Sequence, residues 1–293
     1  MKSKSLILLV TLLLTMPLSA KKPVVEPAVL SVEQEQQFTY YWYAAKHAID
    51  KEKYDDAYVL LEFCNMLKPN DAKTLYLLGV MYMGLGQKEE AVATFERSYA
   101  LQPKGKADTD VLEQLKRIYL ASFQWQKALT MQDELDAING YDAMSVLTRY
   151  HIYTTLNKPK EALKAIDRYL KTDPTNLRFM LFRVELLERT GAKPKVLYKQ
   201  YDEILALDPA NLMVLNNYAY LLATHKGDLQ KAEKMSQITI REQPNNPVYL
   251  DTYGWILHLQ GQDELAKFYL NKALGSADEE TKNVIKQHIE AIK

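Results

Sequence analysis

A small residue inside a helical pattern of hydrophobic and polar positions recurs about every 34 residues along most of the chain. The residues at this recurring position are Ala57, Ala91, Ala128, Ala162, Leu197, Ala232 and Ala266. A period of this length is typical of a helix-turn-helix unit that stacks on copies of itself. The pattern therefore predicts an all-α repeat array that buries one continuous core between neighbouring units.

The second unit shows the pattern most clearly. Its marker positions hold Leu75, Leu78, Gly79 and Tyr82 on a first helix, then Ala91, Phe95 and Pro103 on and after a second. This set resembles the tetratricopeptide repeat, which has a large apolar residue, Leu, a small residue, an aromatic, Ala, an aromatic and Pro at these places. Gly79 and Ala91 mark the closest approach of the two helices, where close packing admits only a small side chain. The resemblance implies a right-handed superhelical solenoid.

The same frame predicts seven repeats within residues 38–277 and a capping helix over 278–293. The predicted repeats are 38–71, 72–105, 109–142, 143–176, 177–211, 212–246 and 247–277. We expect one continuous array, because each unit of a solenoid contacts only its neighbours.

The middle of the array departs from the repeat pattern. The residues out of place are Lys116 and Gln132 in the third unit, Arg149 and Tyr150 in the fourth, and Leu197 in the fifth. Bulky or charged residues at close-packed positions predict altered helix packing there.

The N-terminus has the pattern of a secretory signal peptide over residues 1–20. Lys2 and Lys4 precede the apolar run 6–16, and small residues follow up to Ala20, after which we expect cleavage. An uncleaved membrane anchor is the alternative. Residues 21–37 are interpreted as a linker and the start of the first helix. The expected location is the periplasm, with membrane association only if the signal segment is kept.

Composition offers no reactive chemistry. Lysine plus arginine and aspartate plus glutamate both number 37, so no basic surface for nucleic acid is indicated. Cys64 is the only cysteine, which excludes an internal disulfide and favours a small buried residue. The five histidines lack the spacing of metal ligands. We predict no enzyme activity, no catalytic residue, no metal and no cofactor.

The resemblance also implies a binding surface. In tetratricopeptide proteins the concave wall is formed by positions 2, 5, 9 and 12 of each first helix. Here this selects Trp42, Lys46, Tyr76, Val80, Met83, Glu113, Arg117, His151, Glu185, Asn216, Tyr220, Asp251, Trp255 and His258. The mixture of aromatics with both signs of charge suits a polypeptide partner. For Tyr76, Tyr220 and Trp255, plain packing between helices is the alternative, and Glu113 and Arg117 are spaced for an i,i+4 ion pair.

Four consecutive aromatics, Tyr40, Tyr41, Trp42 and Tyr43, occur in the first helix. They cannot all lie on one side of a helix with 3.6 residues per turn, so at least one should be exposed. The outer members are expected either to dock a partner or an N-terminal extension, or to pad an uncapped end.

The last two repeats, from Asn216 to Trp255, resemble the closing repeats of exported tetratricopeptide proteins of Gram-negative envelopes. That resemblance implies a non-enzymatic scaffold or adaptor that binds a polypeptide in its concave groove. The alternative is a glycan- or peptidoglycan-binding protein in which Trp42, Tyr76, Tyr220 and Trp255 stack on sugar rings.

Overall fold

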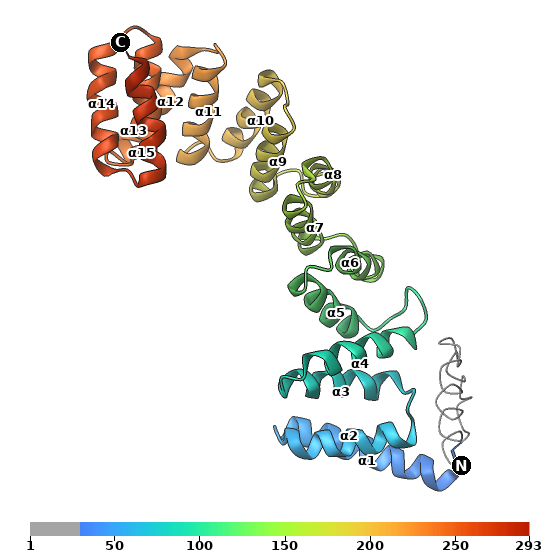
Figure 1. Ribbon diagram of the computed structural model, residues 1–293. Coiled ribbons are helices and arrows are strands. Elements are labelled where there is room, and N and C mark those ends of the chain that lie inside the picture. The colour runs from blue at the N-terminus through green and yellow to red at the C-terminus, as the bar shows by residue number, and fades with distance from the viewer. Residues whose placement is uncertain (1–29, 293) are drawn as a thin grey trace, which may run out of the picture. The chain divides into compact units, whose positions relative to one another are not determined.

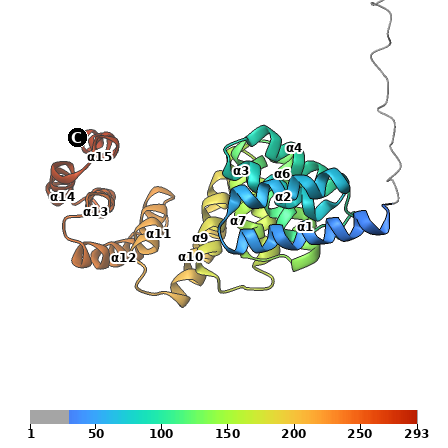
Figure 2. The ribbon, with the colours of Figure 1, turned by 90° about the horizontal axis from the view of Figure 1, so that it is seen from below.

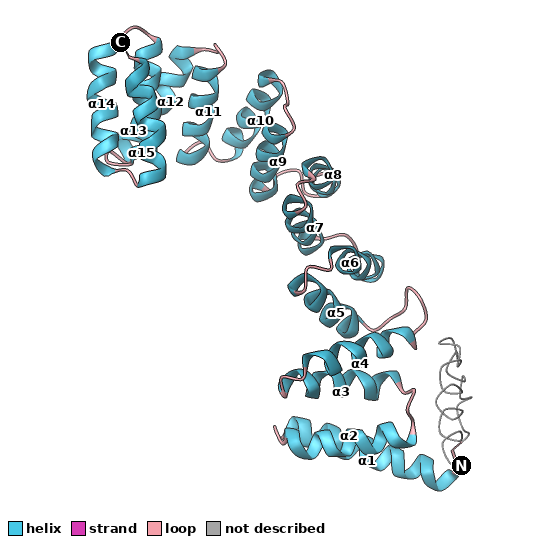
Figure 3. Cartoon of the chain, viewed as in Figure 1, coloured by secondary structure: helices cyan, strands magenta, loops and turns pink. Residues whose placement is uncertain are grey.

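The computed structural model describes residues 30–292, and the predicted signal segment lies outside this range. Every regular element of the described residues is an α-helix, and successive helices within each compact unit run antiparallel to one another (Figures 1 and 3). The predicted all-α repeat array is confirmed. Within the described residues, no helix combines the length and the apolar character that crossing a membrane requires.

The chain divides into two compact units, with the boundary between Phe123 and Gln124. The helices of unit 1 are α1 (Val32–Asp50), α2 (Tyr54–Leu67), α3 (Ala72–Gly84), α4 (Lys88–Ala100) and α5 (Thr109–Ala121). The helices of unit 2 are α6 (Trp125–Asn139), α7 (Ala143–Thr155), α8 (Pro159–Tyr169), α9 (Leu177–Arg189), α10 (Pro194–Leu207), α11 (Leu212–Thr224), α12 (Leu229–Glu242), α13 (Pro247–Leu259), α14 (Asp263–Ser276) and α15 (Glu279–Ala291).

The boundary between the two units lies inside the third predicted repeat, between its two helices. That repeat carries Lys116 and Gln132 at positions where a small and an aromatic residue are usual.

Unit 1 packs two antiparallel helix pairs, α1 with α2 and α3 with α4, and α5 follows α4 (Figure 1). Gly79 of α3 faces the ring of Phe95 of α4, and a Cβ atom at residue 79 would lie 2.7 Å from Phe95 Cε1. No side chain tolerates that distance, which explains the small residue at this place in the repeat. Ala91, Leu78 and Phe95 complete the buried contact.

Helix starts in unit 1 are fixed by side chains that cap free backbone amides. The Asp71 carboxylate accepts a hydrogen bond from the Thr74 amide at 2.9 Å, and the Asp108 carboxylate accepts one from the Asp110 amide at 3.0 Å. Ser31 and Gln34 form a reciprocal capping box at the start of α1. These caps fix where α1, α3 and α5 begin.

The C-terminal part of unit 2 has the same close contact between a glycine and the facing helix, and it ends with a helix that covers the preceding pair. A Cβ atom on Gly254 of α13 would lie 2.8 Å from Leu270 Cγ of α14. Helix α15 packs on both α13 and α14 and buries Ile285 and Ile292 (Figure 2). It therefore covers the last apolar surface of the array, as a capping helix must.

The irregular fourth repeat is held by charged side chains. Arg149 is buried and pairs with Asp133 and, at 2.9 Å, with Asp136, and its guanidinium carbon lies 5.3 Å from the centroid of the Tyr141 ring. Tyr150 stacks on the Phe182 ring of the next repeat, with 4.3 Å between centroids. The altered packing expected from these residues is thus an ion-paired arginine in place of an apolar contact.

Candidate functional site

A hollow of 440 Å³ lies on unit 1, between α1, α3 and the segment that leads into α5. Three of the residues selected from the sequence, Trp42, Lys46 and Tyr76, line it together. Trp42 and Lys46 are one turn apart on α1, and Tyr76 projects from the neighbouring first helix α3. The repeat register therefore brings Trp42 and Tyr76, which occupy the same position in successive repeats, to one surface.

The two aromatic rings in this hollow are held by their neighbours. The Lys46 ammonium lies 5.0 Å from the centroid of the Trp42 ring, a cation–π arrangement. The Tyr76 ring leans on the Phe95 ring at 5.9 Å between centroids. Burial, and then the negative charge of Asp110, raises the pKa of the Tyr76 hydroxyl, so it remains a neutral hydrogen-bonding group.

Charged groups of both signs surround the rings. The lining includes the ammonium group of Lys73 and the carboxylates of Asp50, Asp108 and Asp110. The Gln102 amide oxygen accepts a hydrogen bond of 2.5 Å from the Asp108 backbone amide, which closes the side of the hollow nearest α5. Two aromatic faces ringed by amide, ammonium and carboxylate groups can hold an apolar side chain together with polar backbone.

The other residues selected in unit 1 do not join this hollow. Val80 is half-buried and packs on the core that Leu78 and Met81 share with α1 and α2, and Met83 is half-buried at the end of α3. Glu113 does not pair with Arg117 as its spacing suggested. It forms an ion pair of 2.8 Å with Lys116, and Arg117 donates to Gln114. A buried ammonium group is costly without a counter-charge, which explains why Glu113 pairs with Lys116 and not with Arg117.

In unit 2 the capping helix covers the corresponding surface. His288 of α15 makes a hydrogen bond of 2.8 Å from Nδ1 to the Asp251 carboxylate. Its ring stacks on Trp255 with 4.4 Å between centroids and an interplanar angle of 20°. Asp251 is 7% exposed, so this residue, selected as groove-lining, is an interior partner of α15.

Two more selected residues of unit 2 lie close to this contact: the Tyr220 ring is 6.3 Å from the His288 ring, and the His258 ring is 5.2 Å from the Trp255 ring, between centroids. Asn216 is 3% exposed and belongs to the interior, whereas Tyr220 lines a separate hollow of 440 Å³ with Asn217 and His225. His258 bonds to Asp263 at 2.7 Å. Glu185 accepts a hydrogen bond from the Tyr150 hydroxyl at 2.7 Å, and the exposed His151 lies with its ring 5.9 Å from that of Trp125.

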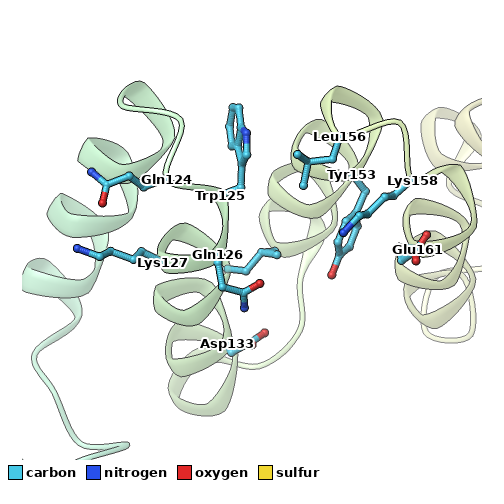
Figure 4. A pocket seen from close by; sticks show the side chains of 10 residues that line it. Gln124, Trp125, Gln126, Lys127, Asp133, Tyr153, Leu156, Lys158 and Glu161 are labelled. Atoms are coloured by element: carbon cyan, nitrogen blue, oxygen red, sulfur yellow. The ribbon is translucent and has the colours of Figure 1, made fainter.

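A further hollow of 610 Å³ lies where α6 faces the turn between α7 and α8 (Figure 4). Trp125, Lys127 and Asp133 come from α6, and Tyr153 and Lys158 from the other side. None of the residues selected from the sequence lines it. Asp133 is engaged by Arg149, so the polar part of this surface serves the packing of the fourth repeat.

Several residues that line the unit 1 hollow were not among those predicted from the sequence. Lys73 and Asp110 occupy position 2 and Ile49 position 12 of their first helices, so the same rule applied to every unit would have found them. His288 was missed as a partner of Trp255 because its helix was interpreted only as a cap. It comes close to one repeat period after Trp255 and continues the row of first helices.

Cys64 lies in the core of unit 1. Cys64 is fully buried, its thiol lies 3.9 Å from the Phe38 carbonyl oxygen, and burial raises its pKa to about 11. The thiol therefore stays protonated at neutral pH and behaves as a small apolar side chain. No group of three or more metal-ligating side chains occurs among residues 30–292.

One segment of the chain matches a known protein family. Residues 72–104, which span α3 and α4, match the family model of the tetratricopeptide repeat. Residues 72–104 therefore match one tetratricopeptide repeat, the repeat that carries Tyr76. None of the curated proteins matches this chain.

Solved structures are similar to this chain at low sequence identity. The Naa15/Naa10 complex bound to HypK-THB has a chain that is 12% identical, with a TM-score of 0.61, and the match covers 86% of this chain and 41% of that one. A tetratricopeptide repeat protein from Parabacteroides merdae is 19% identical over 87% of this chain and 98% of that one, with a TM-score of 0.45. YrrB, described as a tetratricopeptide protein with an unusual peptide-binding site, is 16% identical over 65% of this chain and 95% of that one, with a TM-score of 0.45.

Proposed function

We propose that this protein is a non-enzymatic adaptor of the cell envelope that binds an extended polypeptide in the hollow of unit 1. The observation that carries the proposal is the meeting of Trp42, Lys46 and Tyr76 around one hollow of 440 Å³. Aromatic side chains supply much of the energy of protein recognition, and surrounding polar groups fix orientation and exclude water. The hollow has both components.

A polypeptide fits this chemistry better than a nucleic acid. Lys46 and Lys73 are outnumbered by the carboxylates of Asp50, Asp108 and Asp110, so the surface would repel phosphates. Amide and ammonium groups of a peptide find acceptors in the same carboxylates. Part of the lining, including Lys73, Tyr76 and Gln102, belongs to the segment that matches the tetratricopeptide family model, and stacked repeats use extended surfaces of this kind for binding.

The envelope location rests on the sequence of residues 1–20, with its basic start, apolar run and small residues. We expect the mature protein in the periplasmic fraction, with Lys21 as its first residue. Fractionation of the native host with mass spectrometry of the N-terminus tests this part. A chain found in the cytoplasm with residues 1–20 intact would contradict it.

Peptide binding is tested with the purified chain on an array of overlapping peptides from envelope proteins, followed by titration of labelled hits. The variant Trp42→Ala/Tyr76→Ala should bind at least about tenfold more weakly, as expected when central aromatic contacts are removed. Tyr220→Ala, an aromatic of the other unit, is the matched control and should bind normally.

Equal losses in the site variant and the control would refute a unit 1 groove. A parallel array of glycans and peptidoglycan fragments separates the sugar-binding alternative: retention of glycans alone, lost in the Trp42→Ala/Tyr76→Ala variant, would replace the polypeptide with a carbohydrate ligand.

A further inference from the structure

The outer side of α1 and α2 exposes an extensive apolar surface, called here the end face. It consists of Val32, Tyr40 and Tyr43 on α1 and Val59, Phe63 and Met66 on α2. Tyr40 and Tyr43 are 70% and 67% exposed. The Tyr41 ring joins the two helices by stacking on Phe63, with 5.2 Å between centroids. A contiguous apolar patch on a soluble protein usually marks an interaction site.

The end face points away from the rest of unit 1. Ala45, fully buried in the core, is two residues after Tyr43 and therefore about 200° around the helix from it. Two shallow hollows line this side of α1, and Ala44 belongs to both. The end face is thus where a preceding repeat would stack in a longer array.

Charge is distributed along α1 in a way that complements a second, antiparallel copy. Glu33 and Lys51 are separated by about five full helical turns, so they lie on the same side of the helix near its opposite ends. Among the described residues, neither side chain forms an ion pair. A two-fold axis at the level of position 42 would bring each Glu33 opposite Lys51 of the other copy.

The same axis brings side chains of matching size together. Tyr40 and Ala44 are also centred on position 42, so Tyr40 of one copy would face Ala44 of the other. Ala44 and Tyr40 line a hollow of 700 Å³ along α1, which offers room for a tyrosine ring. Large against small residues across an antiparallel helix pair is the ordinary solution for close packing.

The last helix of the chain argues against head-to-tail stacking. Among the described residues of α15, Val284 alone is a large apolar side chain with substantial exposure, and the outer surface otherwise carries residues such as Glu280, Lys286 and Glu290. An apolar end face would find no apolar counterpart there. A self-complementary patch pairs with its own copy and closes a two-fold dimer.

We infer that the end face is the interface of a two-fold homodimer in which α1 of one chain packs antiparallel on α1 of the other. Trp42 and Lys46 lie on another side of α1, so the unit 1 hollow of each chain stays accessible and a dimer presents two of them. The inference is independent of what the hollows bind.

The first test is the mass of the full chain by sedimentation equilibrium across a hundredfold range of concentration. We expect a reversible dimer for the unaltered protein and a monomer for Tyr43→Glu, with unchanged circular dichroism. The matched control is Phe268→Glu, an aromatic of α14 that is 61% exposed, which should remain dimeric. A monomer at every concentration, or a Tyr43→Glu variant that still dimerises, overturns the inference.

The second test addresses register and does not depend on Tyr43. Lys51→Glu should raise the dimer dissociation constant about tenfold, because two attractions become repulsions. The double variant Glu33→Lys/Lys51→Glu should restore it. Mixed Tyr40→Cys and Ala44→Cys chains should form a disulfide-linked heterodimer on mild oxidation. A double variant as weak as Lys51→Glu alone, together with no crosslink, overturns the antiparallel arrangement.

Discussion

The first helices of the two units carry equivalent positions into different environments. Trp42 and Tyr76 of unit 1 border a hollow, whereas Asp251 of unit 2, at the same position of its repeat, is buried against His288. The difference comes from the next element of the chain. Helix α15 supplies an imidazole that bonds Asp251 and stacks on Trp255, whereas the start of α5 supplies Asp108 and Asp110. The position of a residue in its repeat therefore determines the side of the helix from which its side chain projects. The next helix of the chain determines whether that side is exposed or covered.

Removing α15 should have the largest effect on this contrast. A chain ending at Asp278 loses the burial of Ile285 and Ile292, and each buried isoleucine contributes roughly 1.5–3 kcal/mol. We expect unit 2 to lose about 3–6 kcal/mol in urea unfolding. Iodide quenching should show greater access to tryptophan, since Trp255 loses its cover. Unit 1, followed through alkylation of Cys64, should be unchanged. Loss of both units together would show that they unfold as one.

His288→Ala tests the contact that closes unit 2. It leaves the Asp251 carboxylate buried without its partner, which should cost about 3 kcal/mol of unfolding free energy. Hydrogen exchange should show faster exchange confined to α15 and the facing part of α13. Gln287→Ala, an exposed neighbour on the same helix, is the control and should change stability by less than about 0.5 kcal/mol. Equal exchange rates in His288→Ala and Gln287→Ala would show that the hydrogen bond between His288 and Asp251 does not stabilise the packing of α15.

Gly79→Ala should destabilise unit 1 alone. The added Cβ atom would lie 2.7 Å from the Phe95 ring, so the two helices must separate at a cost of about 1–3 kcal/mol. Gly84→Ala is the matched control on the same helix, because its added Cβ would meet no atom within 4 Å beyond its own chain neighbours and the nearby backbone of its helix. Urea unfolding monitored by Cys64 alkylation should separate the two variants. A neutral Gly79→Ala would mean that the contact relaxes freely.

The smallest effect expected concerns alkaline pH. Burial raises the pKa of the Cys64 thiol to about 11, from an ordinary value near 9. Because the folded pKa is the higher one, its contribution to stability is complete below pH 9 and is lost as pH rises to 11. Cys64→Ala should therefore flatten the fall in unit 1 stability between these values. An equal loss of stability at alkaline pH in the unaltered protein and in Cys64→Ala would mean that ionisation of tyrosines causes that loss.

The sequence predicted the helices because their determinants are local and periodic. Gly79 and Ala91 could be identified as close-packed positions from spacing alone, and both are buried. The candidate hollow was predicted in part: the rule gave Trp42, Lys46 and Tyr76, but it omitted Lys73 and Asp110 at position 2 of their repeats.

The rest depended on partners that spacing does not encode. Arg149 marked an irregular place, yet nothing in the repeat frame shows that it would take Asp136 of the preceding helix as its counter-charge. Asp251 was assigned to a concave wall because its position is usually open, and the structure places it against His288 of the capping helix. Side chains on a repeat surface are thus predictable in direction, whereas their burial depends on the neighbouring helix.

The contact between His288 and Asp251 also sets an order of events during synthesis. Chains emerge N-terminus first, and most contacts of this protein join neighbouring helices, so unit 1 can complete its packing while translation continues. Helix α15 is synthesised after every other described helix, and until it folds, the Trp255 ring and the Asp251 carboxylate lack the His288 contact. A chain without α15 thus exposes an aromatic ring and a carboxylate that the folded unit 2 covers.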